Sequence, residues 1–197
     1  LNFPENLEKI EDCAFQGCDG LYGTLQLPEK LSYIGLATFN GCSGFTGQLD
    51  IPKNVQEIGD WAFLNCSGLT NVSIPGRVAT IGSASFGGCS SLTSVRIPES
   101  VTNIEGATFE GCFRLTSIAI PDGVTSIGWD AFYGCSGLTS ITIPEGMTSI
   151  ESGTFYGCSS LTGITIPEGV KSIGNSAFSG CSSLTSVRIP ESVTSIG

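Results

Sequence analysis

The chain repeats itself at an interval of 23 or 24 residues, and this period constrains its fold more than any other feature. Every proline belongs to the series, and the spacing is 24, 24 and then six times 23. The nine positions are Pro4, Pro28, Pro52, Pro75, Pro98, Pro121, Pro144, Pro167 and Pro190. A fixed period in this range is typical of solenoids, in which each unit is too small to bury a core alone and stacks on its neighbours.

Phenylalanine and cysteine follow the same period, with each Phe three residues before its Cys. The pairs are Phe15 and Cys18, Phe39 and Cys42, Phe63 and Cys66, Phe86 and Cys89, Phe109 and Cys112, Phe132 and Cys135, Phe155 and Cys158, and Phe178 and Cys181. We therefore expect one array over residues 1–197, of about eight coils, without a linker or a second domain. Both ends stop inside the pattern, so we expect the array to be a fragment of a longer chain without its capping repeats.

Within one unit, apolar Val95 lies between polar Ser94 and Arg96. This alternation predicts a short strand with one buried face. Pro98 is expected to end the strand and to occupy the second position of a type I turn. The small residues before Phe-x-Gly-Cys predict one helical or 3₁₀ turn, closed by glycine. The extra residue of the two longer units falls in segments 19–28 and 43–52, where a loop should absorb it.

The unit closely resembles the leucine-rich repeats of the BspA-like type. The resemblance rests on Leu-x-x-Val-x-Ile-Pro, on Val-x-x-Ile-Gly and on Ala-Phe-x-Gly-Cys, as in residues 184–197 and 177–181, and covers essentially the whole chain. It implies an α/β, right-handed, horseshoe-like solenoid with the strands on its concave side. It also implies an extracellular or cell-surface protein that uses the array for adhesion or ligand binding.

Composition excludes several classes of function. The net charge of −10, with eight Lys and Arg in total, argues against nucleic-acid binding. The absence of His removes Ser-His-Asp and Cys-His catalysis and most zinc sites. No apolar run reaches the ~20 residues of a membrane span, so we expect no membrane insertion by this segment. We expect no catalytic residue, no metal site and no cofactor.

The cysteines are expected to be structural. Equivalent positions on stacked coils lie about 4.8 Å apart with parallel side chains, which is farther than the roughly 3.5–4.5 Å between the Cβ atoms of a disulfide. A buried free Cys fills such a position as a small hydrophobe. Cys13 lies outside the series and is the thiol expected to be exposed.

Acidic residues follow seven of the nine prolines, and five consecutive coils carry one from Glu99 onward. Stacked carboxylates can bind Ca²⁺, but one carboxylate per coil favours a solvated turn. Asn65 and Asn71 begin Asn-x-Ser sequons. Asn65 precedes a Cys of the series and is expected to be buried, whereas Asn71 should point out from its strand.

Two surfaces are candidates for ligand binding. The first is the outward face of the strands, where the polar positions vary from coil to coil: Gln26, Asp50, Asn71, Ser73, Arg96, Thr142, Thr165 and Arg188. On an acidic chain Arg96 and Arg188 are its most informative residues, since guanidinium groups suit carboxylates and sulfates. The second is an aromatic patch of Trp129, Tyr133 and Tyr156, and exposed aromatics favour protein or carbohydrate contacts.

These features predict a non-catalytic recognition or adhesion module with a protein or glycan partner. The alternative is a passive spacer that projects or rigidifies a larger surface protein. Nearly identical later repeats favour the spacer, while the varied early repeats favour recognition.

Overall fold

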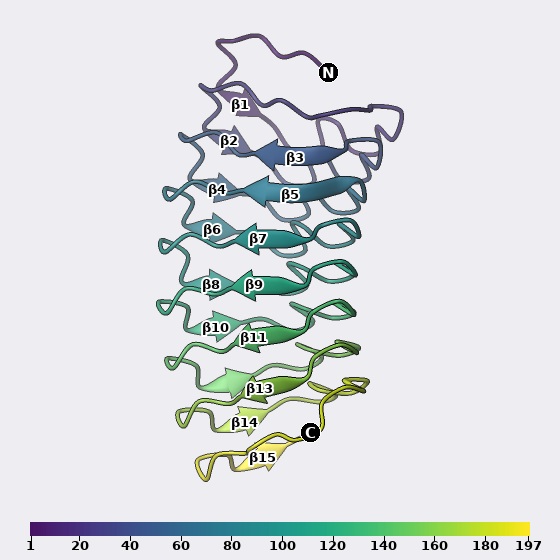
Figure 1. Ribbon diagram of the computed structural model, residues 1–197. Helices are drawn as coiled ribbons and strands as arrows, with labels where there is room; N and C mark the ends of the chain where they lie inside the picture. Colours follow the sequence, from purple (N-terminus) through teal and green to yellow (C-terminus); the bar gives the residue numbers. More distant parts are fainter.

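The computed structural model describes residues 1–197 as an elongated column of stacked coils, with the N-terminus at one end and the C-terminal coil at the other (Figure 1). One side of the column is a six-stranded parallel sheet in the order β13-β11-β9-β7-β5-β3. Its strands are β3 (Gly47–Asp50), β5 (Leu69–Ser73), β7 (Ser94–Arg96), β9 (Ser117–Ala119), β11 (Ser140–Thr142) and β13 (Gly163–Thr165). This confirms the solenoid of stacked parallel strands.

A second side of the column consists of two-residue strands that follow each proline turn. They pair in parallel in three groups, β1-β2-β4-β6, β10-β8 and β12-β14-β15. They are β1 (Lys9–Ile10), β2 (Tyr33–Ile34), β4 (Glu57–Ile58), β6 (Thr80–Ile81), β8 (Asn103–Ile104), β10 (Ser126–Ile127), β12 (Ser149–Ile150), β14 (Ser172–Ile173) and β15 (Ser195–Ile196).

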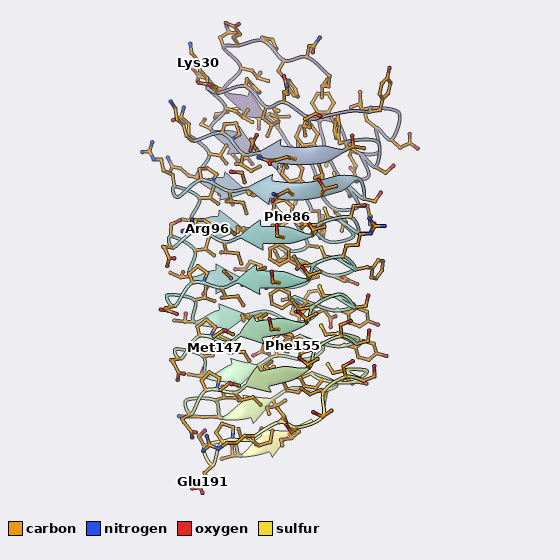
Figure 2. All side chains as sticks on the ribbon, viewed as in Figure 1. Lys30, Phe86, Arg96, Met147, Phe155 and Glu191 are labelled. Carbon is orange, nitrogen blue, oxygen red and sulfur yellow. The ribbon has the colours of Figure 1, made fainter.

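The core is one continuous cluster of 47 buried residues that runs through the column. Phenylalanine rings stack along the length of this core, one from each coil. In order they are Phe15, Phe39, Phe63, Phe86, Phe109, Phe132, Phe155 and Phe178. Adjacent ring centroids lie 5.4 to 6.0 Å apart, with interplanar angles of 12° or less. Figure 2 labels two of them, Phe86 and Phe155. The period of the sequence therefore places one phenylalanine at the same position of every coil, so that consecutive rings stack.

Each proline begins its turn and does not occupy the second position, so that detail of the expectation is wrong. The Val101 N–H donates to the Pro98 carbonyl at 3.0 Å, and the equivalent bond recurs at all nine prolines. Glu99 and Ser100 are thus the central turn residues. Proline ends the strand because it has no N–H for the sheet, while its carbonyl remains free to close the turn.

The third side of each coil is not helical, and the structure contains no helix, so the α/β class and the helical or 3₁₀ turn are corrected. Alternate N–H groups donate to carbonyls of the next coil at 2.7 to 2.9 Å: Ala107 to Trp129, Phe109 to Ala131 and Gly111 to Tyr133. The intervening N–H groups close β-turns within the coil. Packed helices need 8–10 Å between axes, about twice the strand spacing, so a helix could not stack at the pitch of the sheets.

Two left-handed backbone positions per coil make these alternating turns. One lies two residues before each Phe, at Cys13, Ala37, Trp61, Ala84, Ala107, Asp130, Gly153 and Ser176. The other precedes each Cys of the series and is glycine in seven coils and Asn65 in the eighth, with φ of 59°. Asparagine tolerates this region better than most residues, which explains the substitution. Asn65 is exposed, so its expected burial is wrong, while Asn71 is exposed as expected.

The extra residue of the longer units is absorbed where it was expected. The register between β3 and β5 shifts between Gly47 and Gln48. Gly47 has φ of 79°, and Gly23 has φ of 87° in the unit before it. These two glycines lie within segments 43–52 and 19–28, and in the first of these segments the irregularity falls at the start of strand β3 and not in a loop.

Candidate functional site

The strand face brings most of its predicted residues into two groups. Asp50 pairs with Ser73, and Ser73 pairs with Arg96, across β3, β5 and β7. Thr142 pairs with Thr165 in β11 and β13, and Thr165 bridges to Arg188. Asn71 lies in the neighbouring column beside Ser94. All of these side chains are exposed, so the sheet presents them outward as expected.

The two arginines of this face differ in their surroundings. The Arg188 Nη1 lies 2.6 Å from Glu168 Oε1 in an exposed ion pair, the only ion pair in the structure. Arg96, labelled in Figure 2, pairs with no carboxylate and has Ala119 and Ser73 as its strand neighbours. Arg96 is therefore the free cation of the face, whereas the charge of Arg188 is already engaged.

Gln26 lies near the N-terminal end, on the coil before β3, and belongs to no strand. It is exposed and lines an open hollow of about 740 Å³ together with residues of the first two coils, among them Asn2, Phe3 and Lys30. Gln26 therefore lies outside the paired strands, although the adjacent Leu27 lines a second hollow together with Asp50.

The two tyrosines of the predicted aromatic patch lie together, and no ring contact joins Trp129 to them. The rings of Tyr133 and Tyr156 stack with centroids 4.6 Å apart and an interplanar angle of 4°. Trp129 is 58% exposed, and a Cβ placed on Gly106 of the preceding coil would lie 2.6 Å from its Cε2 atom. The indole therefore lies flat over Gly106, with its other face toward solvent.

Sequence reasoning missed two partly buried carboxylates on the same two coils as Trp129 and Gly106. Glu110 occupies the position of Tyr133 on the preceding coil, and Asp130 follows Trp129 directly. Burial raises the pKa of both carboxyls, and the charge of Asp130 raises that of Glu110 further. Phe113, 56% exposed, was also missed. It stands where most coils have Ser, and that substitution was the available signal.

The cysteine column has a structural role, because its thiols form hydrogen bonds between adjacent coils. Each thiol from Cys42 to Cys181 donates to the carbonyl of the Phe on the preceding coil, at 3.1 to 3.3 Å. Burial raises the pKa of Cys89 and of Cys158 to about 12. Cys13 lies outside the column and is exposed.

The carboxylates that follow the prolines, such as Glu99 and Glu145, are exposed on their turns. No group of three or more Cys, Asp or Glu side chains is arranged to hold a metal ion. None of the structure's elements is a helix with the length and apolar character needed to cross a bilayer.

Comparisons with known proteins agree with this architecture. The family model for the BspA type leucine rich repeat region matches residues 1–113 and 102–197, with six copies. A leucine rich repeat protein from T. pallidum is 32% identical, with a TM-score of 0.72, over 76% of this chain and 72% of that chain. A leucine-rich repeat protein from Bacteroides ovatus is 29% identical, with a TM-score of 0.69, over 100% of this chain and 68% of that chain.

A leucine rich cell surface protein from Faecalibacterium prausnitzii is 27% identical, with a TM-score of 0.53, and covers 95% of this chain and 65% of that chain. None of the curated proteins compared with the chain matches it. Because the family model spans both halves of the sequence and the strands stack in its repeat register, the chain belongs to the BspA-type leucine-rich repeat family.

Proposed function

We propose that the chain is a non-catalytic recognition module that binds a macromolecular partner, a protein or a glycan, through the exposed side chains of several coils. The observation that carries the proposal is a contrast between two columns of the same strands. The buried column repeats as Leu49, Val72 and Val95, whereas the exposed column beside it changes from Asp50 to Ser73 to Arg96. A fixed scaffold with a varied outer face suits recognition.

An adhesive role at the cell surface is part of the proposal. It is supported by the likeness to the protein of F. prausnitzii, which is described as a cell surface protein. A non-catalytic role is supported by the absence of His, which leaves the many Ser and Thr hydroxyls without the usual general base.

A passive spacer is the second candidate function. It is favoured by the later coils, where the exposed positions of β9, β11 and β13 are Ser117, Ala119, Ser140, Thr142, Gly163 and Thr165. These side chains are small and uncharged, so they offer little to a specific partner.

Arrays of matrix proteins and glycans test the proposal. The chain should be retained by at least one arrayed molecule, and one of two double variants should lose that retention. Arg96→Ala with Arg188→Ala removes the cations of the sheet face, and Tyr133→Ser with Tyr156→Ser removes the ring stack. Both changes are at exposed sites, so Tm should change little. Retention by no array supports the spacer, and retention that neither variant reduces would show that another surface of the chain binds.

A further inference from the structure

The C-terminal ends of the sheet strands and the proline turns meet along one edge of the solenoid. The arrows of β5 and β7 point to this edge, where the chain turns at each proline (Figure 1). The contact is direct at Arg188 and Glu168, whose charged groups lie 2.6 Å apart. Arg188 stands two residues before its proline, and Glu168 stands one residue after the proline of the preceding coil. Because the coils stack in register, these two positions face each other at every step of the array.

Three cations gather at this edge on consecutive coils, and we name them the basic patch: Lys53, Arg77 and Arg96. All three are exposed, and none takes part in an ion pair. Arg96, labelled in Figure 2, occupies the position of Arg188. Gly76 occupies the position of Glu168 on the preceding coil. A Cβ placed on Gly76 would meet nothing within 4 Å, so the space opposite Arg96 is open.

Arg77 is the neighbour of Arg96 across one step of the array. Arg77 stands two residues after its proline, as Asn6 does in the first coil. Arg96 stands two residues before the proline of the next coil, as Gln26 does. Asn6 and Gln26 line the same hollow at the N-terminal end, so the positions of the two arginines also share one surface.

Lys53 is the neighbour of Arg77 on its other side. Lys53 occupies the position of Glu29, and Arg77 occupies the position of Asn54 on the following coil. The Asn54 side chain donates to the Glu29 carbonyl at 3.3 Å, so these two positions are in contact. At a pitch of about 4.8 Å, the three coils of the basic patch span about 10 Å.

The charge of the basic patch selects an anionic partner. The chain has a net charge of −10, yet these three cations are uncompensated. The one ion pair of the structure shows what an arginine binds at this edge, namely the carboxylate of a glutamate side chain. Guanidinium groups hold carboxylates through charge-assisted hydrogen bonds.

The ends of the basic patch distinguish between anionic partners. Exposed Asp50 lines a hollow together with Lys53, and exposed Glu99 follows the proline of the coil of Arg96. A glycan with dense, continuous negative charge would meet both carboxylates, because it extends beyond the three cations. A protein segment can place separate carboxylates against the cations and leave the ends unoccupied. The arrangement therefore favours a short acidic segment of a protein.

We propose that the basic patch binds an acidic segment of a partner protein, with one glutamate or aspartate carboxylate against Arg96 in the space beside Gly76. Arg77 and Lys53 bind further carboxylates of the same segment. This inference rests on the proposed function as a recognition module and names the chemistry of its partner.

A peptide titration tests the inference. The probe is Gly-Glu-Gly-Glu-Gly-Glu-Gly-amide with an uncharged fluorescent dye on its N-terminus. Its comparison peptide carries glutamine, a neutral residue of the same shape, in place of glutamate. Fluorescence anisotropy measures the binding of each peptide to the chain. We expect the glutamate peptide to bind and the glutamine peptide to bind about fivefold more weakly.

Two double variants locate the site. Arg77→Gln with Arg96→Gln removes two charges of the basic patch and should weaken binding of the glutamate peptide about fivefold. Arg114→Gln with Lys171→Gln makes the same change of net charge at two exposed residues that form no ion pair. This control should leave binding unchanged.

Gly76→Glu tests the open space opposite Arg96. It places a carboxylate at the position that Glu168 has on its own coil, and so should weaken binding of the glutamate peptide about fivefold. Its control is Gly163→Glu, which adds the same charge on β13, where a Cβ also meets nothing within 4 Å. The control should bind the peptide as the parent does.

Three results would overturn the inference: equal binding of the two peptides, an equal loss of binding in the patch variants and their controls, or binding of a heparin oligosaccharide without binding of the glutamate peptide. The first two leave the array experiment untouched, so a chain retained by an arrayed protein or glycan keeps its proposed function. The third makes the basic patch a glycan site and also keeps that function. A chain that binds neither the glutamate peptide nor any arrayed molecule ends both proposals.

Discussion

The indole ring of Trp129 lies over the backbone of Gly106 on the preceding coil. A Cβ placed on Gly106 would lie 2.6 Å from Cε2 and 2.7 Å from Nε1 of the ring. The equivalent residues of three earlier coils, Leu36, Asp60 and Ser83, carry side chains. Gly106 thus provides the space in which the ring lies flat, and the two residues depend on each other although they are 23 positions apart.

Gly106→Ala should therefore displace Trp129. In the Trp61→Phe background we expect a red shift and stronger quenching of tryptophan emission by iodide, because the ring loses its contact with the backbone. The matched control is Gly123→Ala, since a Cβ there meets nothing within 4 Å. Emission that is the same in both variants would contradict the contact.

Thiol reactivity should separate one cysteine from the column. Cys13 is exposed, and the seven thiols from Cys42 to Cys181 are buried and donate to carbonyls. At pH 8 we expect Ellman's reagent to react rapidly with Cys13 in the folded protein. In denaturant it should count all nine cysteines of the sequence. A count near one in denaturant would show that the column is oxidised, and Cys13→Ser identifies the rapid thiol.

Stability should fall at alkaline pH because of the buried thiols. Burial raises the pKa of Cys42 from its usual value of 9.0 to about 11, and that of Cys89 from 9.0 to about 12. The folded state therefore holds protons that the unfolded state has released above pH 9, so stability is full below about pH 9 and declines as pH rises toward 12. Each such thiol lowers the free energy of unfolding by about 1.4 kcal/mol per pH unit in that window.

Urea unfolding at pH 8 and pH 10 measures this decline. Cys89→Ala should be less stable than the parent at pH 8 but should lose less stability between the two pH values. Cys13→Ser, at an exposed position, should lose as much free energy of unfolding between pH 8 and pH 10 as the parent does. If the parent and Cys89→Ala lose the same free energy of unfolding between the two pH values, the buried thiol does not contribute to the pH dependence of stability.

Ser85 is expected to be a destabilising residue. Its buried hydroxyl has no hydrogen-bond partner, while Thr108 at the equivalent position donates to the Glu105 carbonyl at 2.7 Å. Ser85→Ala should raise the free energy of unfolding by about 1 kcal/mol, since it removes an unsatisfied polar group. Thr108→Ala should lower it by a similar amount. Chemical denaturation of the two variants checks this, and destabilisation by Ser85→Ala would mean that the hydroxyl is bonded.

The sequence was sufficient for the architecture and for much of the surface. The period of proline, phenylalanine and cysteine predicted the solenoid, because residues spaced by one full coil must stack on each other. The alternation around Val95 predicted which strand positions are buried, since successive side chains of a strand point to opposite faces. These inferences depend only on spacing and polarity, and for that reason Arg96 and Tyr133 were placed on the surface correctly.

Tertiary structure decided the rest. Ala37, Ala84 and Ala107 adopt a left-handed backbone that their own preferences disfavour, because only that conformation directs alternate N–H groups to the next coil at the pitch of the sheets. No local pattern could predict it. Two other contacts likewise join residues that are far apart in the sequence: the ion pair of Arg188 with Glu168, and the contact of the Trp129 ring with Gly106. Their geometry exists only after stacking, so stacking alone determined which charges and which ring faces remain free.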